Sequence, residues 1–147
     1  SLIMSIDGYD KVNEYIRYPT KFNVFLKNAS YLHSMQKNIS FGITVQACNL
    51  PNLDIMREQL ELLYPEKTKE YYDYNILRQP EFLNISSLKP KVVEQVYTQT
   101  KIKVLKGFIE DNYNFNEDNN IKLKNYLADI DIKRNLNSKK ILPWCWK

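Results

Sequence analysis

Glycine is scarce in this chain, with only 3 glycines among 147 residues. Neither GxGxxG nor GxxxxGK[ST] occurs, and these are the glycine-rich loops whose backbone amides cradle phosphate groups. The sequence therefore disfavours dinucleotide-binding and P-loop classes of protein.

Cysteine and histidine are also rare, with two cysteines and one histidine. Cys48 and Cys145 do not have the spacing of metal ligands, and a disulfide framework needs more cysteines, so we interpret both as reduced thiols. His33 falls in the middle of an expected helix, where a surface or boundary position is the usual outcome.

Long apolar runs are absent, and no stretch approaches the roughly 18 residues of a membrane span. No basic segment followed by an apolar segment opens the chain, so we see no signal peptide and expect a cytoplasmic protein without membrane contact. The net charge is +4, from 21 Lys and Arg against 17 Asp and Glu. This mild excess is more typical of solvated helix faces than of a nucleic-acid-binding surface.

The first half of the chain alternates between strand and helix patterns. Residues 2–6, 39–47 and 71–77 are predicted strands, of which the second alternates apolar and polar side chains. Amphipathic helices are expected between them, over about 22–38 and 53–64, with one or two helical turns at 10–16. Such alternation is typical of βαβ units and a parallel sheet.

After Pro80 the pattern becomes helical. We predict one helix from Pro90 to Gly107, a polar loop over 110–120, and a last helix over about 121–132. The expected fold class is therefore α/β: residues 1–80 form three parallel strands alternating with helices, and residues 81–147 form a helical region packed on them.

The predicted sheet is small for a parallel sheet. Three parallel strands with helices on one side leave apolar edges and one face uncovered, and the first strand starts at residue 2. We therefore expect half of a larger α/β sheet or barrel, with a tendency to aggregate or to pair with another chain.

Polar side chains gather where the predicted strands end. Ligands of parallel α/β folds bind at the carboxyl ends of the strands, and neutral polar groups with arginine suit the hydroxyls, carboxylates and amides of a small ligand. The candidates are Ser5 and Asp7 after the first strand, Thr44, Gln46 and Asn49 at the second, and Asn75 and Arg78 at the third.

Four segments, in order, resemble radical S-adenosylmethionine (radical SAM) enzymes of the short phage and bacterial type with a degenerate auxiliary domain. They are "SIDGYDKVNEYIRYPTKFNVFLKNASYL", "ITVQACNLPNLDIM", "YYDYNILRQPEFLNISSLKPKVVEQV" and "DIDIKRNLNSKKILPW". The first matches the S-[IL]-D-G end of the fourth barrel strand with an arginine twelve residues after the serine. The resemblance implies the C-terminal half of a partial TIM-type barrel, covering nearly the whole chain.

The resemblance also implies roles for individual residues. Ser5 and Asp7 match residues that contact the ribose or methionine part of S-adenosylmethionine, and Arg17 matches the arginine that pairs with its carboxylate. Thr44, Gln46, Asn49 and Asn75 match positions that face the barrel interior. Without the resemblance, an Asp-Gly turn would explain Ser5 and Asp7, and a solvated charge would explain Arg17.

One defining feature of that family is missing. The C-x-x-x-C-x-x-C loop that holds a 4Fe–4S cluster, and the Gly-Gly-Glu that binds the amino group of the cofactor, do not occur here. The resemblance implies that both come from an N-terminal half, of the same protein or of another chain, and that these 147 residues are inactive alone. The substrate, a peptide or a small molecule, is not indicated, and we expect no auxiliary cluster.

Two other hypotheses remain. The chain could be a non-catalytic module that binds a protein or nucleic acid through a basic helical surface, or a small-ligand binder that keeps the strand-end pocket without redox chemistry.

Overall fold

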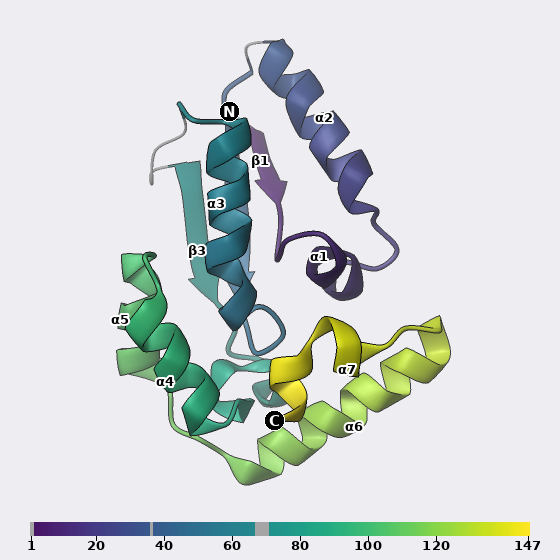
Figure 1. Ribbon diagram of the computed structural model, residues 1–147, viewed down its shortest axis with the longest axis vertical. Helices are drawn as coiled ribbons and strands as arrows, with labels where there is room; N and C mark the ends of the chain where they lie inside the picture. The colour runs from purple at the N-terminus through teal and green to yellow at the C-terminus, as the bar shows by residue number, and fades with distance from the viewer. Residues whose placement is uncertain (1, 36, 67–70) are drawn as a thin grey trace.

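Three parallel strands lie side by side in the order of the sequence (Figure 1). The computed structural model describes residues 2–35, 37–66 and 71–147. Strands β1 (Leu2–Ser5), β2 (Ile39–Val45) and β3 (Tyr72–Ile76) form one sheet, with β2 in the centre. All three predicted strands and their parallel arrangement are confirmed.

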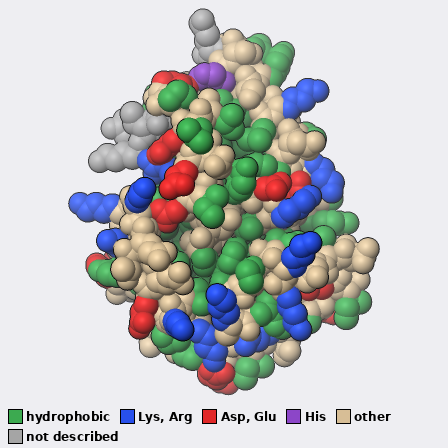
Figure 2. Space-filling model, viewed as in Figure 1, with side chains coloured by type: hydrophobic (Ala, Val, Ile, Leu, Met, Phe, Trp, Pro, Cys, Tyr) green, Lys and Arg blue, Asp and Glu red, His purple; other side chains and the backbone are tan. Residues whose placement is uncertain are grey.

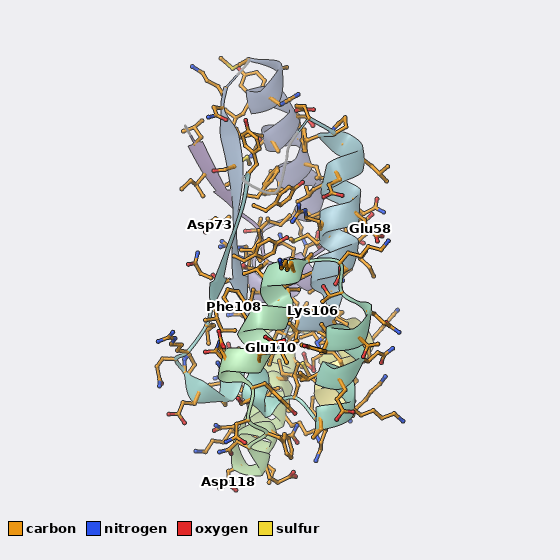
Figure 3. The ribbon with its side chains drawn as sticks, turned by 90° about the vertical axis from the view of Figure 1, so that its left-hand side faces the viewer. Glu58, Asp73, Lys106, Phe108, Glu110 and Asp118 are labelled. Atoms are coloured by element: carbon orange, nitrogen blue, oxygen red, sulfur yellow. The ribbon has the colours of Figure 1, made fainter. Side chains whose placement is uncertain are left out.

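Helices α2 (Phe22–Ser34) and α3 (Leu53–Leu63) cover one face of this sheet, and the short α1 (Lys11–Ile16) follows β1 (Figures 1 and 3). Alternate side chains of β2 point into the core beneath them, and Ile39, Phe41, Ile43 and Val45 are all fully buried or nearly so. Burying each such side chain stabilises the fold by about 1.5–3 kcal/mol. The period-2 pattern of the sequence thus identified the buried face of the sheet.

The opposite face of the sheet carries no helix in the described part of the chain. Figure 3 shows Asp73 on the side of the sheet that faces away from α3, the helix that carries Glu58. The strand register places Ser5 beside Gly42, Gly42 beside Asp73, and Thr44 beside Asn75 on this same side. We refer to this face as the open face; its side chains are those of Ile3, Ser5, Ser40, Thr44, Asp73 and Asn75.

The predicted helix from Pro90 to Gly107 is wrong, because two helices occupy this region, α4 (Pro90–Gln99) and α5 (Lys103–Asn112). Thr100 is extended, and its hydroxyl accepts a hydrogen bond from the backbone N–H of Ile102. The N–H of Lys101 donates instead to the Asp54 carboxylate at 2.9 Å. These local partners end the helix, while Ile102 is buried on the far side of the break and makes the apolar pattern look continuous.

The predicted loop over 110–120 is also wrong in its extent. The helix α5 continues to Asn112, and α6 (Glu117–Arg134) begins four residues earlier than expected. Asn116 caps α6, since its side-chain oxygen accepts from the N–H of Asn119. Of the Asp and Asn residues that suggested a loop, Asp111 and Asn112 end α5, Asn116 caps α6, and Asp118 to Asn120 lie in the first turn of α6.

Beyond the carboxyl ends of the strands lie α6 and the short α7 (Ser138–Ile141) (Figure 1). Trp144, near the chain end, donates its indole N–H to the carbonyl of Ala47, just past β2, at 3.1 Å. The helical region thus packs against the edge of the sheet where parallel folds place their ligands. None of the helices in the described ranges is both long and apolar enough to cross a membrane.

Candidate functional site

The first strand ends in a tight turn that buries Asp7, which is only 4% exposed. Its backbone N–H donates to the side chain of Asn13, and a Cβ on the next residue, Gly8, would come within 2.6 Å of Val12. Glycine is therefore required where the turn meets α1. The Asp-Gly pair thus forms the turn that its sequence suggests, and it also orients a buried carboxylate.

That carboxylate joins three segments. One oxygen of Asp7 accepts from the backbone N–H of Thr44 at 2.8 Å, and the other accepts from Nε of Arg17 at 2.9 Å. The first bond holds the turn after β1 against β2, and the second holds the end of α1 against the turn. Asp7 is fully engaged by protein groups and positions its neighbours.

Arg17 pairs with Asp7 through only part of its guanidinium group. The ion pair with Asp7 occupies Nε, and the side chain is 36% exposed. Among the described residues, its two Nη groups make no hydrogen bond. A guanidinium held by one edge in this way keeps its other donors for an acceptor such as a carboxylate.

Ser5, Thr44 and Asn75 all lie on the open face. The hydroxyls of Ser5 and Thr44 make no hydrogen bond to another described residue, whereas Asn75 has a long contact of 3.4 Å to Asp73. The structure therefore brings the predicted strand-end residues of three strands together on one surface. Among the described residues, no side-chain hydrogen bond joins Ser5 to Asp7 or Arg17.

Asn49 has a structural place in the turn after β2. It is fully buried, its side-chain oxygen accepts from the N–H of Gln46, and its side-chain amide donates to the carbonyl of Thr44. Both groups of the amide are thus satisfied within the turn. Asn49 shapes the strand end and has no free group for a ligand.

Gln46 and Arg78 lie in two different hollows beyond the strands. Gln46 is 7% exposed and lines a cavity of about 140 Å³ at the ends of β2 and β3, which also includes Arg134 of α6. Arg78 is exposed and lines a separate hollow of about 220 Å³ with side chains that include Asn84 and Asn119. The eight predicted residues therefore do not line one cleft. They divide into the open-face residues, the Asp7–Arg17 pair, Asn49 in the turn after β2, and the two separate hollows of Gln46 and Arg78.

The two cysteines are close neighbours in the fold, which their separation in the sequence did not indicate. Both are buried and free, and burial raises the pKa of the Cys145 thiol, with the adjacent Cys48 thiol adding to the effect. Cys145 also lies 3.6 Å from the carbonyl of Ala47. The chain end is thereby held at the end of β2.

A second network missed by sequence reasoning ties α1 to the C-terminal region. The hydroxyl of Tyr15 donates to the Asp131 carboxylate at 2.9 Å, and the N–H and hydroxyl of Ser138 donate to the same carboxylate. Burial and the Asp131 carboxylate raise the pKa of Tyr15. Asp131 lies in the segment "DIDIKRNLNSKKILPW", and its carboxylate is the only sign of this network that the sequence offers.

The described residues contain no group of three or more His, Cys, Asp or Glu side chains that could hold a metal ion. A 4Fe–4S cluster needs several thiolates, and the two thiols here are buried at the chain end and at the end of β2. The residues of this chain therefore do not fit such a cluster. The open face and the partly paired Arg17 present hydroxyl, amide and guanidinium groups.

No family model matches the chain, and neither does any curated protein or solved structure. The class that the fold defines is an α/β protein with a three-stranded parallel sheet, helices on one face and a helical C-terminal region.

Proposed function

We propose that this chain is the C-terminal half of a radical SAM protein, whose three strands complete a partial TIM-type barrel with strands supplied by an N-terminal half. The observation that carries the proposal is the two-sided character of the sheet. One face is apolar and covered by α2 and α3, whereas the open face presents the polar Ser5, Thr44, Asp73 and Asn75 beside one exposed apolar residue, Ile3. A barrel places helices outside its sheet and turns the uncovered face toward its interior, and ligands bind at the carboxyl ends of the strands, where Ser5, Thr44 and Asn75 lie.

In this proposal the residues of the chain bind and orient S-adenosylmethionine. Ser5 contacts the ribose or methionine part, and the free donors of Arg17 bind the carboxylate. Asp7 acts as a positioning residue, since its carboxylate already holds Arg17 and the backbone of Thr44. S-adenosylmethionine bound there would supply radical chemistry by one-electron cleavage, with the electron coming from a reduced cluster of the other half and methionine as the second product.

The other predicted residues have three proposed roles: they face the barrel interior, shape a turn or contact the substrate. Thr44 and Asn75 face the proposed interior, Gln46 lies at the strand ends, and Asn49 shapes the turn. Arg78 lies farther out, in the hollow with Asn84 and Asn119, and is proposed as a substrate contact.

The test is to read the coding sequence upstream of Ser1 and to produce the complete protein. The proposal requires a C-x-x-x-C-x-x-C motif and a Gly-Gly-Glu upstream. Anaerobic reconstitution with iron and sulfide should then give charge-transfer absorption. A start codon within or just before this chain, or a complete protein without that absorption, would contradict the proposal.

A second candidate is a non-catalytic module that binds nucleic acid. It is favoured by one observation: residues 121–147 hold seven Lys or Arg against two Asp, so this region carries more positive charge than the chain as a whole. Figure 2 shows Lys and Arg side chains gathered over the lower part of the molecule. Binding to a single-stranded oligonucleotide that falls steeply with added salt would support this candidate, and salt-independent or absent binding would exclude it.

A further inference from the structure

The two cysteines of the chain stand at positions 48 and 145 of the sequence and meet in the fold. Cys48 lies in the turn directly after β2, and Cys145 lies in the last 3₁₀ turn, Pro143–Trp146. The Cys145 thiol lies 3.6 Å from the carbonyl of Ala47, the residue just before Cys48, and within hydrogen-bonding reach of the Cys48 thiol. Two free thiols from distant parts of the sequence therefore face each other.

Neither thiol has the properties of a catalytic nucleophile or of a metal ligand. Both side chains are buried, and burial raises the pKa of Cys145, with the neighbouring Cys48 thiol adding to the effect. A buried, protonated thiol reacts slowly and binds metals poorly, since the thiolate is the reactive form. Within the described ranges, no group of three or more His, Cys, Asp or Glu side chains gathers as a metal site would require. The property that the fold gives these cysteines is their proximity to each other.

The place where the cysteines meet joins the C-terminal region to the sheet. The carbonyl of Ala47, at the end of β2, accepts the indole N–H of Trp144 at 3.1 Å and contacts the Cys145 thiol. Both contacts are noncovalent and come from the four-residue turn that carries Cys145. We propose that Cys48 and Cys145 form an intramolecular disulfide under oxidising conditions, which fastens this turn to the end of β2 and is released by reduction. The proposal does not rest on the radical SAM proposal, because both cysteines belong to this chain.

The chemistry is thiol–disulfide exchange with a small disulfide such as oxidised glutathione. The turn that carries Cys145 is short, so its local opening admits the reagent while the sheet stays folded. Cys48, which also lines the cavity of about 140 Å³ at the strand ends, makes the first attack. Its thiolate attacks one sulfur of glutathione disulfide and releases one glutathione, which leaves a mixed disulfide. Cys145 then loses its proton to water, attacks the Cys48 sulfur and releases the second glutathione, so the two cysteines lose the two electrons that glutathione disulfide gains.

The experiment is an equilibration of the chain in glutathione redox buffers, in the folded state and in concentrated urea, with the thiols trapped by acid and counted by mass spectrometry. A disulfide that closes a loop of about 100 residues removes chain entropy from the unfolded state, and a fold that holds the two thiols together favours it. The folded chain should therefore become half oxidised at a ratio of glutathione disulfide to squared glutathione at least about a hundredfold lower than the unfolded chain. A hundredfold difference corresponds to about 2.8 kcal/mol of unfolding free energy, so oxidation should raise the urea midpoint by about 1 M or more.

Two variants identify the bond. Cys145→Ala and Cys48→Ala each remove one sulfur, so the oxidant should leave the urea midpoint of either variant unchanged. The second variant keeps the test decisive if the first does not fold. The proposal would be overturned by half-oxidation at the same ratio with and without urea, by disulfide-linked dimers in place of the loss of two hydrogens within one chain, or by a urea midpoint that does not rise on oxidation.

Discussion

Replacing Asp7 by Asn should destabilise the protein far more than its small change in volume suggests. The substitution leaves one oxygen where there were two, so either Thr44 N–H or Arg17 Nε faces an NH₂ group. Asp7 is 4% exposed, so the lost bond is not replaced by water, whereas Arg17 is 36% exposed and recovers some solvation. Breaking a fully buried pair costs about 3–5 kcal/mol, and the exposure of Arg17 reduces this to about 2–3 kcal/mol.

The assay is urea unfolding followed by far-UV circular dichroism, with Asp7→Asn, Arg17→Gln and the double variant forming a cycle. We expect a coupling of about 1–2 kcal/mol between the two positions. Asp129→Asn is the matched control, because Asp129 forms an exposed ion pair with Lys133 at 2.8 Å and its removal should cost less than about 0.5 kcal/mol. A cost for Asp7→Asn no larger than that of the control, or zero coupling, would refute the role of Asp7 as the centre of this network.

Two further predictions concern the stability of the helices. The Glu14 carboxylate accepts a hydrogen bond from the N–H of Phe22, the first residue of α2. This bond, and to a smaller extent Lys11, lowers the pKa of Glu14. Its contribution to the free energy of unfolding is therefore fully present above the ordinary pKa of 4.5 and is lost as the pH falls through the lowered pKa. Glu14→Gln should cost about 1 kcal/mol near neutral pH and nothing near pH 2, and urea midpoints at both pH values check this; an equal cost at both would contradict the capping role. Leu123→Ala in α6 should cost about 2–5 kcal/mol because Leu123 is fully buried, whereas Ile132→Ala on the same helix, at a residue 83% exposed, should stay within about 0.5 kcal/mol; equal urea midpoints for the two variants would contradict the packing of α6.

The sheet could be predicted because its information is local. Side chains alternate along β2 with period 2, and Pro and Asn mark where the strands stop. The break between α4 and α5 could not be predicted, since the apolar residues on both sides keep a helical spacing. It depends on a contact between Lys101 and Asp54, which are 47 residues apart.

The candidate site could likewise be predicted only where it depends on local sequence. The strand-end positions of Ser5, Thr44 and Asn75 follow from the alternation of strand and loop, so their common surface could be expected. The pairing of Arg17 with Asp7 spans only 10 residues but depends on the turn at Gly8 and on the length of α1. The hollow that Gln46 and Arg134 line could not be predicted, because it forms only when α6 packs across the strand ends, more than 80 residues after Gln46 in the sequence.

The measurement that tests the central claim most directly is the formation of 5′-deoxyadenosine by the complete reconstituted protein under dithionite, in the wild type and in two variants. Arg17→Lys keeps a charge for Asp7 but loses the forked donors, and Lys133→Gln is the control on an exposed position. The account predicts 5′-deoxyadenosine from the wild type and the control, with a reduction of about tenfold or more in Arg17→Lys that higher concentrations of S-adenosylmethionine partly restore. No 5′-deoxyadenosine from the wild type, or an equal yield from Arg17→Lys and the control at every concentration, would contradict it.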